Sequence, residues 1–394
     1  MDLNQRKIAN IHDFYLDFDT MCDRLRELKS KFPSGLIIPI LGSDIKNPGL
    51  AKMVDETNQC DYLNKVFIAL SALDSKDYEE ALRLSRGFKV PCQVIWCNKP
   101  GTIAVLEELK RKGLDVTQLC GKGKDVWMAA GIASLELFAF AMHDADIVSY
   151  NKMLPTKLLY PIIEPKLDFF FSKGYYARID ADKKRLYGRL QRLFINPLLE
   201  VLQEKLQYSR FTTYLQSFSY PLAGEIAVYS DLATHLRIPC DWGLELGLLS
   251  ELYRNASYRR ICEVDLGLYD HRHKEIDSDG LLKTAEDSFV TLLRTLTETE
   301  NIEVSEPFLI SLQVAYRRLA QDKIRQYHAD ATCNNLVFDR HEEEANVDLL
   351  SNVILSGGHK YLANPVRAQL PDWLRAVAAM PDIRERLREE AVET

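Results

Sequence analysis

Two aspartates separated by one residue form the first candidate for chemistry in this chain. Asp144-Ala145-Asp146 directly follows the apolar run at residues 137–142. Two carboxylates around a single residue can hold a divalent cation such as Mg2+ or Mn2+, which can neutralise a diphosphate leaving group. The same spacing also occurs at Asp17/Asp19, Asp180/Asp182 and Asp277/Asp279. The alternative is a polar strand end that caps the next turn, so the spacing alone supports metal binding only as a hypothesis.

A loop of alternating glycine and lysine is the second candidate. Gly121-Lys122-Gly123-Lys124 precedes a segment that we expect to be helical. Free backbone N–H groups and the positive end of a helix dipole suit an anion, and either lysine would add a full charge. The alternative is a flexible surface loop with solvated lysines. The loop matches neither the Walker sequence nor G-x-G-x-x-G, which argues against both of those nucleotide-binding motifs.

A histidine at the end of another apolar run is the third candidate. His271 lies in the segment 268–274, and its imidazole could complete a metal site that is built from carboxylates. In an extended segment, His271 and His273 would share one face. A solvated histidine is the alternative, since the chain has eight histidines.

Scattered charged residues in the middle of the chain form a fourth group. A guanidinium can grip a phosphate or carboxylate through two hydrogen bonds, and carboxylates can accept hydrogen bonds from sugar hydroxyls. The cationic candidates are Lys173, Arg178 and Arg189, and the acidic ones are Glu225, Asp241 and Glu245. For any one of them, the alternative is a charge on a solvated face.

The elements that must position these residues alternate between strand and helix patterns. Short apolar runs predict strands at 36–41, 66–70, 94–97 and 137–142. Helices are predicted at 77–85 and 103–112 and after the loop at 121–124. This alternation favours a parallel sheet with helices on both faces, and a ligand site at the carboxyl ends of the strands.

The remaining segments suggest a four-part organisation. Apolar residues at steps of three and four predict a helix over 3–32, which ends at Pro33. Further strands are predicted at 168–179, 225–229 and 261–268, and further helices at 242–254 and at 188–206, where Pro197 should kink or split the helix. Beyond about residue 276 only helix signals remain, including a start at Ser305 for a helix over 308–326. The predicted parts are an N-terminal helix (1–34), a Rossmann-like nucleotide-binding part (35–150), an acceptor-binding part of the same domain (151–275) and a helical extension (276–394).

Composition narrows the function classes. The 394 residues are 46% hydrophobic and 27% charged, which is typical of a globular protein. A net charge of -7 argues against a nucleic-acid partner, which requires clustered basic residues. No run approaches the roughly 18 apolar residues of a membrane span, and the first residues lack the pattern of a signal peptide. The eight cysteines contain no C-x-x-C pair, so we expect reduced thiols, no structural zinc site and a cytoplasmic location.

Taken in order, these segments resemble the glucosyl-3-phosphoglycerate synthases, retaining glycosyltransferases of the A-type fold, and the related mannosylglycerate synthases. The resemblance runs from about Leu36 to Lys274. The segments that carry it are Pro39-Ile40-Leu41, Gly121-Lys122-Gly123 before Trp127, Asp144-Ala145-Asp146, 173–178, Gly188-Arg189 before 196–199, 221–225, 242–249, and 265–268 before His271-Arg272. It implies an A-type glycosyltransferase fold, a Rossmann-like mainly parallel sheet flanked by helices, with a helical C-terminal extension.

The resemblance also implies a role for individual residues. Asp144, Asp146 and His271 would bind the Mg2+ or Mn2+ ion. The donor nucleotide sugar would contact Pro39, Leu41, Asp44, Ser71, Gly121, Lys122, Asp144, Ala145 and Asp146. The acceptor would contact Arg189, Gln191, Gly224, Arg272 and Lys274. The catalytic residues would be Asp146, Lys122, Arg189 and Glu245, with Glu245 holding sugar hydroxyls.

The implied reaction moves a hexose, with glucose favoured, from a nucleotide sugar to 3-phosphoglycerate or a similar small anionic acceptor, as in the synthesis of the compatible solute glucosylglycerate. Gly42-Ser43-Asp44 replaces the acidic pair of the family, so the donor base stays open among UDP, GDP and ADP. One alternative is a mannosylglycerate-synthase-like transferase that uses glycerate. Alternatives of other classes are a sugar-1-phosphate nucleotidyltransferase, for which Gly42-Ser43-Asp44 contains too little glycine, and a non-catalytic assembly protein. The helical extension would cover the site or form a homodimer contact.

Overall fold

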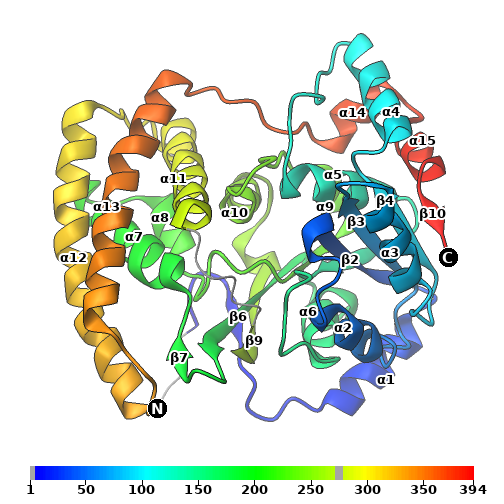
Figure 1. The fold of residues 1–394 in the computed structure, drawn as a ribbon, viewed down its shortest axis with the longest axis horizontal. Helices are drawn as coiled ribbons and strands as arrows, with labels where there is room; N and C mark the ends of the chain where they lie inside the picture. The colour runs from blue at the N-terminus through cyan, green and yellow to red at the C-terminus, as the bar shows by residue number, and fades with distance from the viewer. Residues whose placement is uncertain (1–4, 271–277) are drawn as a thin grey trace.

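A mostly parallel sheet organises the chain. The structure is a computed structural model that describes residues 5–270 and 278–394 (Figure 1). Its sheet has ten strands in the order β1-β9-β6-β8-β5-β2-β3-β4-β10, with β7 paired to β6. The four strands predicted in the first part are present as parallel neighbours: β2 (Ser34–Leu41), β3 (Lys65–Ser71), β4 (Cys92–Trp96) and β5 (Ala139–Met142). The predicted Rossmann-like arrangement is therefore confirmed.

Helices connect these parallel strands, as the right-handed crossover of such sheets requires. The two predicted helices are α3 (Ser75–Ser85) and α4 (Pro100–Arg111), and the helix after the glycine-lysine loop is α5 (Lys122–Ala133). Two further helices, which the sequence patterns do not predict, are α2 (Gly49–Thr57) and α6 (Met153–Ile163).

The second half of the sheet is joined through one reversed strand. β8 (Ile226–Tyr229) runs antiparallel to both β5 and β6 (Phe171–Asp180). β9 (Ile261–Tyr269) is parallel to β6. Because β8 is antiparallel to both of its neighbours, β5 and β6 point the same way, and the carboxyl ends of β2, β5, β6 and β9 lie on one side of the sheet. This side carries the candidate residues.

The predicted helix over 3–32 is wrong in its first half. Residues 9–11 form strand β1 (Ala9–Ile11), which pairs in parallel with β9, and only α1 (Phe18–Leu28) is helical. Asp17 caps this helix by accepting a hydrogen bond from the backbone N–H of Thr20. Pairing with a distant strand decides the structure of residues 9–11, and local spacing cannot report such pairing.

The segment at 188–206 changes helix type next to Pro197 and is not interrupted there. A π-helical stretch (Leu190–Ile195) passes directly into α7 (Asn196–Lys205), whose first turn contains Pro197. The short helices α8 (Arg210–Leu215) and α9 (Ser230–Thr234) flank β8 in sequence. The predicted helix near 242–254 is α10 (Leu244–Asn255).

The C-terminal region has two parts. Among the long helices, α13 (Arg340–Ala363) packs on both α11 (Ser278–Glu300) and α12 (Glu306–Cys333), and α12 packs on α7 (Figure 1, yellow to orange). The chain then returns to the first half through α14 (Trp373–Ala379), α15 (Ile383–Glu389) and β10 (Val392–Glu393), which pairs with β4. Ser305 caps α12 as predicted. The prediction that residues beyond about 276 form only helices is wrong at β10. A strand of two residues is too short to show a periodic pattern of apolar residues.

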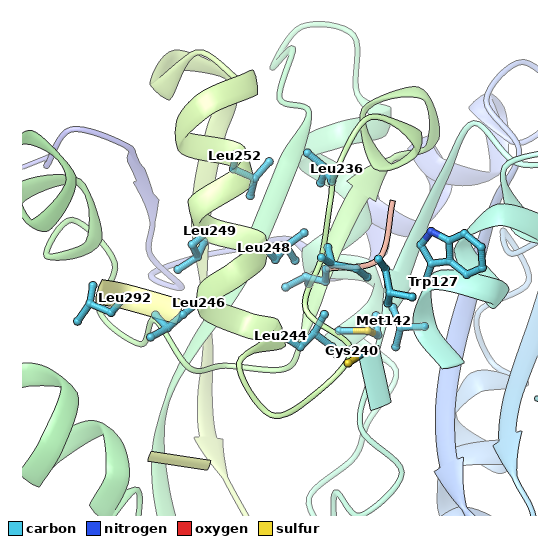
Figure 2. Close-up of a cluster of buried hydrophobic side chains, with 14 of the residues drawn as sticks. Trp127, Met142, Leu236, Cys240, Leu244, Leu246, Leu248, Leu249, Leu252 and Leu292 are labelled. Carbon is cyan, nitrogen blue, oxygen red and sulfur yellow. The ribbon is translucent and has the colours of Figure 1, made fainter. Parts of the chain in front are cut away.

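Two apolar cores cover the two faces of the sheet. Successive residues of β2 enter different cores, with Ile37 in one and Leu36 and Ile38 in the other, so the strand is buried on both faces. Figure 2 shows leucines of α10 packed toward Trp127 of α5 and Met142 of β5. A cavity of about 40 Å³ in this region is lined by apolar side chains alone, so it offers no group for polar chemistry. Among the described residues, no helix combines the length and apolarity that crossing a bilayer needs.

Candidate active site

Three elements bring the first two sequence candidates together. Asp144 follows the carboxyl end of β5, Lys122 begins α5, and Glu245 lies in the first turn of α10. The Lys122 Nζ atom lies 2.6 Å from Asp144 Oδ1 and 3.1 Å from Glu245 Oε1. The structure therefore joins Lys122 and Glu245, which lie 123 positions apart in the sequence, with Asp144 into one charged group.

The glycines of the loop place Lys122 against the segment that leads into α10. Gly121 has φ +120°, which side-chain-bearing residues rarely adopt, and the Gly123 N–H donates to the Cys240 carbonyl at 3.1 Å. A Cβ atom on Gly123 would lie 2.0 Å from the Pro239 carbonyl oxygen. Backbone packs directly on backbone here, and this contact sets the distance between Lys122 and Glu245.

The charges of this group favour an ionised, cation-binding site at neutral pH. Burial alone would lower the pKa of Lys122, but Asp144 and Glu245 together raise it. Burial alone would raise the pKa of Asp144, yet the Lys122 ammonium brings it below its usual value. Burial and the charge of Asp144 raise the pKa of Asp146 to about 6. Both aspartates are thus mainly ionised at pH 7, and their oxygens are the ligand type that Mg2+ and Mn2+ prefer.

The predicted third metal ligand, His271, comes directly after the end of β9. This strand end is hydrogen-bonded to residues 143–149, the loop after β5 that contains Asp144 and Asp146 and that we call the aspartate loop. The Asp270 carbonyl accepts hydrogen bonds from the backbone N–H groups of Val148 at 2.9 Å and Ser149 at 3.1 Å. The Asp270 N–H donates to Ser149 Oγ at 2.9 Å. His271, Arg272 and Lys274 lie outside the described residues, so their predicted roles stay predictions. Within the described part of the chain, no three histidine, cysteine or acidic side chains group closely enough to hold a metal.

Gly224 packs directly against the carboxylate of Asp144. A Cβ atom at this position would lie 2.6 Å from Asp144 Oδ2, so only glycine leaves the carboxylate in place. The next residue, Glu225, is fully buried and accepts a hydrogen bond from the Tyr269 hydroxyl at 2.6 Å. Burial and nearby Asp144 raise the pKa of Glu225 to about 7. The segment 224–225 thus contacts both the aspartate loop and the strand that leads to His271.

The scattered charged candidates from the middle of the chain are not all solvated. Several of them are buried or form ion pairs. Lys173 is 1% exposed, donates to the Ala223 carbonyl, and has its pKa lowered to about 8 by burial. Arg178 is close enough to lower the pKa values of both Asp144 and Asp146. Asp241 pairs with Arg367 at 2.9 Å. Arg178 is half-buried and adds positive potential beside the two aspartates.

Four of the predicted donor residues lie at the carboxyl ends of β2 and β3. Pro39 is half-buried, Leu41 is exposed, and Asp44 lies in the 3-10 turn (Gly42–Asp44) that follows β2. The Ser71 hydroxyl at the end of β3 donates to Asp125 Oδ2 at 2.6 Å. Burial raises the pKa of Asp125 to about 6. Sequence reasoning missed Asp125, although its position three residues after Lys122 places it on the same side of α5.

Among the predicted acceptor residues that the structure describes, Gln191 and Gly224 are buried and the Arg189 side chain is 11% exposed. Gln191 is 2% exposed, and its amide donates to Asn196 at 2.6 Å and accepts from the Leu222 N–H at 3.2 Å. These bonds let Gln191 fix the loop that leads to Gly224. Arg189 lies beside a cavity of about 40 Å³, and its guanidinium is 3.4 Å from a carboxylate oxygen of Glu342.

Comparisons with known proteins agree on one family name. No protein-family model matches the chain. The chain is 48% identical to the glucosyl-3-phosphoglycerate synthase of Methanococcoides burtonii, over 100% of this chain and 98% of that protein. It is 36% identical to the enzyme of the same name from Persephonella marina, over 89% and 88% of the two chains.

Solved structures with the same fold share less sequence. The Mycobacterium tuberculosis glucosyl-3-phosphoglycerate synthase, in complex with Mn2+, UDP-glucose and phosphoglyceric acid, superposes with a TM-score of 0.55 at 19% identity, covering 74% of this chain and 88% of that one. The mannosyl-3-phosphoglycerate synthase of Rubrobacter xylanophilus gives 0.56 at 18% identity, covering 76% and 84%. At such identity these likenesses establish the fold, which is that of A-type glycosyltransferases.

Proposed function

Because the chain belongs to the glucosyl-3-phosphoglycerate synthase family, we propose that it transfers glucose, with retention, from a nucleoside-diphosphate glucose to a hydroxyl of 3-phosphoglycerate. The observation that carries this proposal is the Lys122–Asp144–Glu245 group at the carboxyl ends of the strands. A donor site needs charges that receive a diphosphate next to groups that hold a sugar, and this group supplies both.

The divalent cation would be held by Asp146 and His271, with Asp144 helping. When bound, Mg2+ or Mn2+ supplies Lewis-acid stabilisation of the negative charge on the departing diphosphate. Lys122 directs its ammonium at the same oxygens, with the backbone N–H groups of the loop beside it. Such preorganised charge favours the transition state over the ground state, because the charge on the leaving group grows as the bond breaks.

The remaining residues orient the sugar and the acceptor. Glu245 accepts hydrogen bonds from sugar hydroxyls, and Arg189, with Arg272 or Lys274, binds the anionic acceptor beside the anomeric carbon. The bond from the anomeric carbon to the β-phosphate oxygen breaks, and a bond to the acceptor oxygen forms on the same face. The acceptor proton passes to the leaving phosphate oxygen, so no protein nucleophile is required.

The test is a matrix of donors and acceptors. UDP-, GDP- and ADP-glucose and GDP-mannose are each incubated with 3-phosphoglycerate or glycerate, with Mn2+ or with a chelator. We expect metal-dependent formation of glucosyl-3-phosphoglycerate. Transfer of mannose to glycerate would identify a mannosylglycerate synthase instead. Formation of a nucleotide sugar from a sugar 1-phosphate and a nucleoside triphosphate would identify a nucleotidyltransferase. Inertness toward every pair would leave a binding or assembly role.

An aspartate variant tests the assignment of the site within the same assay. Asp146→Ala should lower kcat at least 10²–10³-fold, the typical cost of losing one electrostatic stabiliser. Asp19→Ala removes an exposed aspartate of a second D-x-D pair and should leave kcat unchanged. Equal turnover of the Asp146→Ala variant and the wild type would remove the metal assignment.

We further propose a cytoplasmic homodimer. Six of the eight cysteines are buried and all eight are free thiols, which supports a reducing compartment. Ile310 and Val314 of α12 are 48% and 67% exposed, and Leu349 of α13 is 46% exposed, which supports a contact through the long helices. Sedimentation equilibrium should give twice the chain mass, and Val314→Glu should shift it toward one chain.

A further inference from the structure

Three arginines face two glutamates at the junction between the catalytic domain and the long helices. Arg185, in β7 (Arg185–Leu186), and Arg189 approach Glu342, while Arg192 approaches Glu343. Glu342 and Glu343 lie in the first turn of α13, which Asp339 caps. The Val337 N–H donates to the Lys184 carbonyl at 2.7 Å, so the start of α13 is fixed against the β6–β7 hairpin.

The two glutamates are held differently. Glu343 and Arg192 are both buried and form two hydrogen bonds of 2.9 and 3.1 Å, which is the bidentate geometry of a structural pair. Glu342 is 38% exposed, and its single carboxylate is shared by Arg185 and Arg189. Two positive charges therefore face one negative charge, and the contact to Arg189 is long at 3.4 Å.

This group lies next to the aspartate loop through Arg178. The Tyr187 N–H donates to the Arg178 carbonyl at 2.9 Å, and a Cβ atom on Gly188 would lie 3.7 Å from the Arg178 Cβ. The positive charge of Arg178 in turn favours the ionised forms of Asp144 and Asp146. A cavity of about 40 Å³ opens at this place, lined by Arg185, Leu186, Tyr187, Arg189, Glu342 and Glu343.

The carboxylate oxygens of Glu342 accept hydrogen bonds from Arg185 and Arg189. The phosphate or carboxylate oxygens of a bound ligand would accept the same hydrogen bonds. We propose that Glu342 is a built-in competitor for the anionic acceptor, whose carboxylate occupies Arg185 and Arg189 until an acceptor phosphate or carboxylate replaces it. This inference rests on the proposed function for the role of Arg189 as an acceptor residue. Glu342 thereby sets the concentration of acceptor that the enzyme requires.

The test is Glu342→Gln, which keeps the shape of the side chain and removes its charge. The acceptor KM, at saturating donor, should fall about two- to fivefold, the range that one partly exposed ion pair corresponds to. The donor KM should stay unchanged. Glu344→Gln is the matched control, because Glu344 lies in the same turn of α13 but pairs with Arg340 of its own helix. An acceptor KM that is unchanged or raised in Glu342→Gln would overturn the proposal.

Direct binding separates this proposal from the proposed function. Inorganic phosphate, titrated calorimetrically without donor, should bind Glu342→Gln more tightly than the wild type by the same factor. If the wild type transfers no sugar, the proposed function fails, and phosphate binding still decides the role of Glu342. If the glutamine variant unfolds, Glu342→Asp provides the test, because its shorter side chain should weaken the contact and lower the acceptor KM in part. Equal phosphate affinity in all the folded variants would contradict the proposal.

Discussion

The ammonium nitrogen of Lys122 lies 2.6 Å from a carboxylate oxygen of Asp144. This contact brings the start of one helix to the end of the central strand β5. Lys122 is shared by Asp144 and Glu245, and in the proposed function its ammonium also stabilises the diphosphate of the donor.

Replacing Lys122 with methionine should remove this charge while keeping most of its apolar stem. Asp144 would then lose the ammonium that lowers its pKa, and the leaving diphosphate would lose one stabiliser. We expect kcat/KM to fall about 10²–10³-fold, as for loss of one preorganised electrostatic group. Steady-state kinetics should show a smaller loss for Lys122→Arg, which keeps the charge. Lys124→Met, in the same loop, is the control, and an equal loss there would assign the effect to the loop instead.

Gly224→Ala should displace the Asp144 carboxylate, because the added Cβ would lie 2.6 Å from Asp144 Oδ2. We expect a loss of activity of at least tenfold and a raised requirement for Mn2+, with little change in the circular dichroism spectrum. Gly280→Ala is the matched control in α11, where an added Cβ meets nothing within 4 Å. Full activity of the Gly224→Ala variant would show that the close packing of residue 224 against Asp144 is not needed for activity.

Asp146→Asn should change how stability depends on pH in the metal-free chain. The pKa of Asp146 is raised to about 6 from an ordinary 3.8, so its ionised form is disfavoured in the folded state. An acid of this kind contributes most stability below its unfolded pKa, and that contribution is lost as pH rises through about 6.

The asparagine variant cannot ionise, so it should be more stable than the wild type at pH 8 and equally stable near pH 4. A difference of one in pKa corresponds to about 1.4 kcal/mol, which gives an upper limit of about 3 kcal/mol. Urea unfolding with a chelator present, at both pH values, measures the difference. A difference that does not vary with pH would show that Asp146 keeps an ordinary pKa.

Trp373→Ala should destabilise the whole chain. The rings of Trp373 and Trp127 stack with centroids 4.0 Å apart, and each indole N–H donates to a backbone carbonyl, one of Pro371 and one of Trp127. Removing a buried tryptophan typically costs about 3–5 kcal/mol of unfolding free energy. Leu374→Ala, at a neighbouring side chain that is 53% exposed, should cost less than about 0.5 kcal/mol. Similar denaturation midpoints for the two variants would mean that the stack contributes little.

The strand pattern of the first half was readable from the sequence because these strands are buried on both faces. An uninterrupted apolar run such as residues 36–41 is typical of a strand that is covered on both sides, and the polar residues that follow it must lie at the sheet edge. Asp144 and Asp146 were found in this way, whereas Lys122 was found from the glycine-lysine loop that precedes a helix. The structure brings Lys122 to 2.6 Å from Asp144, and the roles of these residues stay predictions. The role of His271 stays a prediction.

Other features depend on contacts between distant residues, which local patterns do not report. β1 has the apolar spacing of a helix, yet it pairs with β9 more than 250 positions away. Trp373 contacts Trp127 across 246 positions, and Glu342 meets Arg189 across 153. Each of these residues is of an ordinary type in an ordinary segment. Only the folded chain identifies its partner.

The two outermost strands of the main sheet are both short. β1 contains three residues and β10 contains two, and the side chain of Glu393 in β10 pairs with Lys65. Open sheet edges can recruit strands from other molecules, and short or charged edge strands oppose this. Both ends of this sheet therefore offer little backbone for such recruitment, so we expect the folded chain to resist edge-to-edge association.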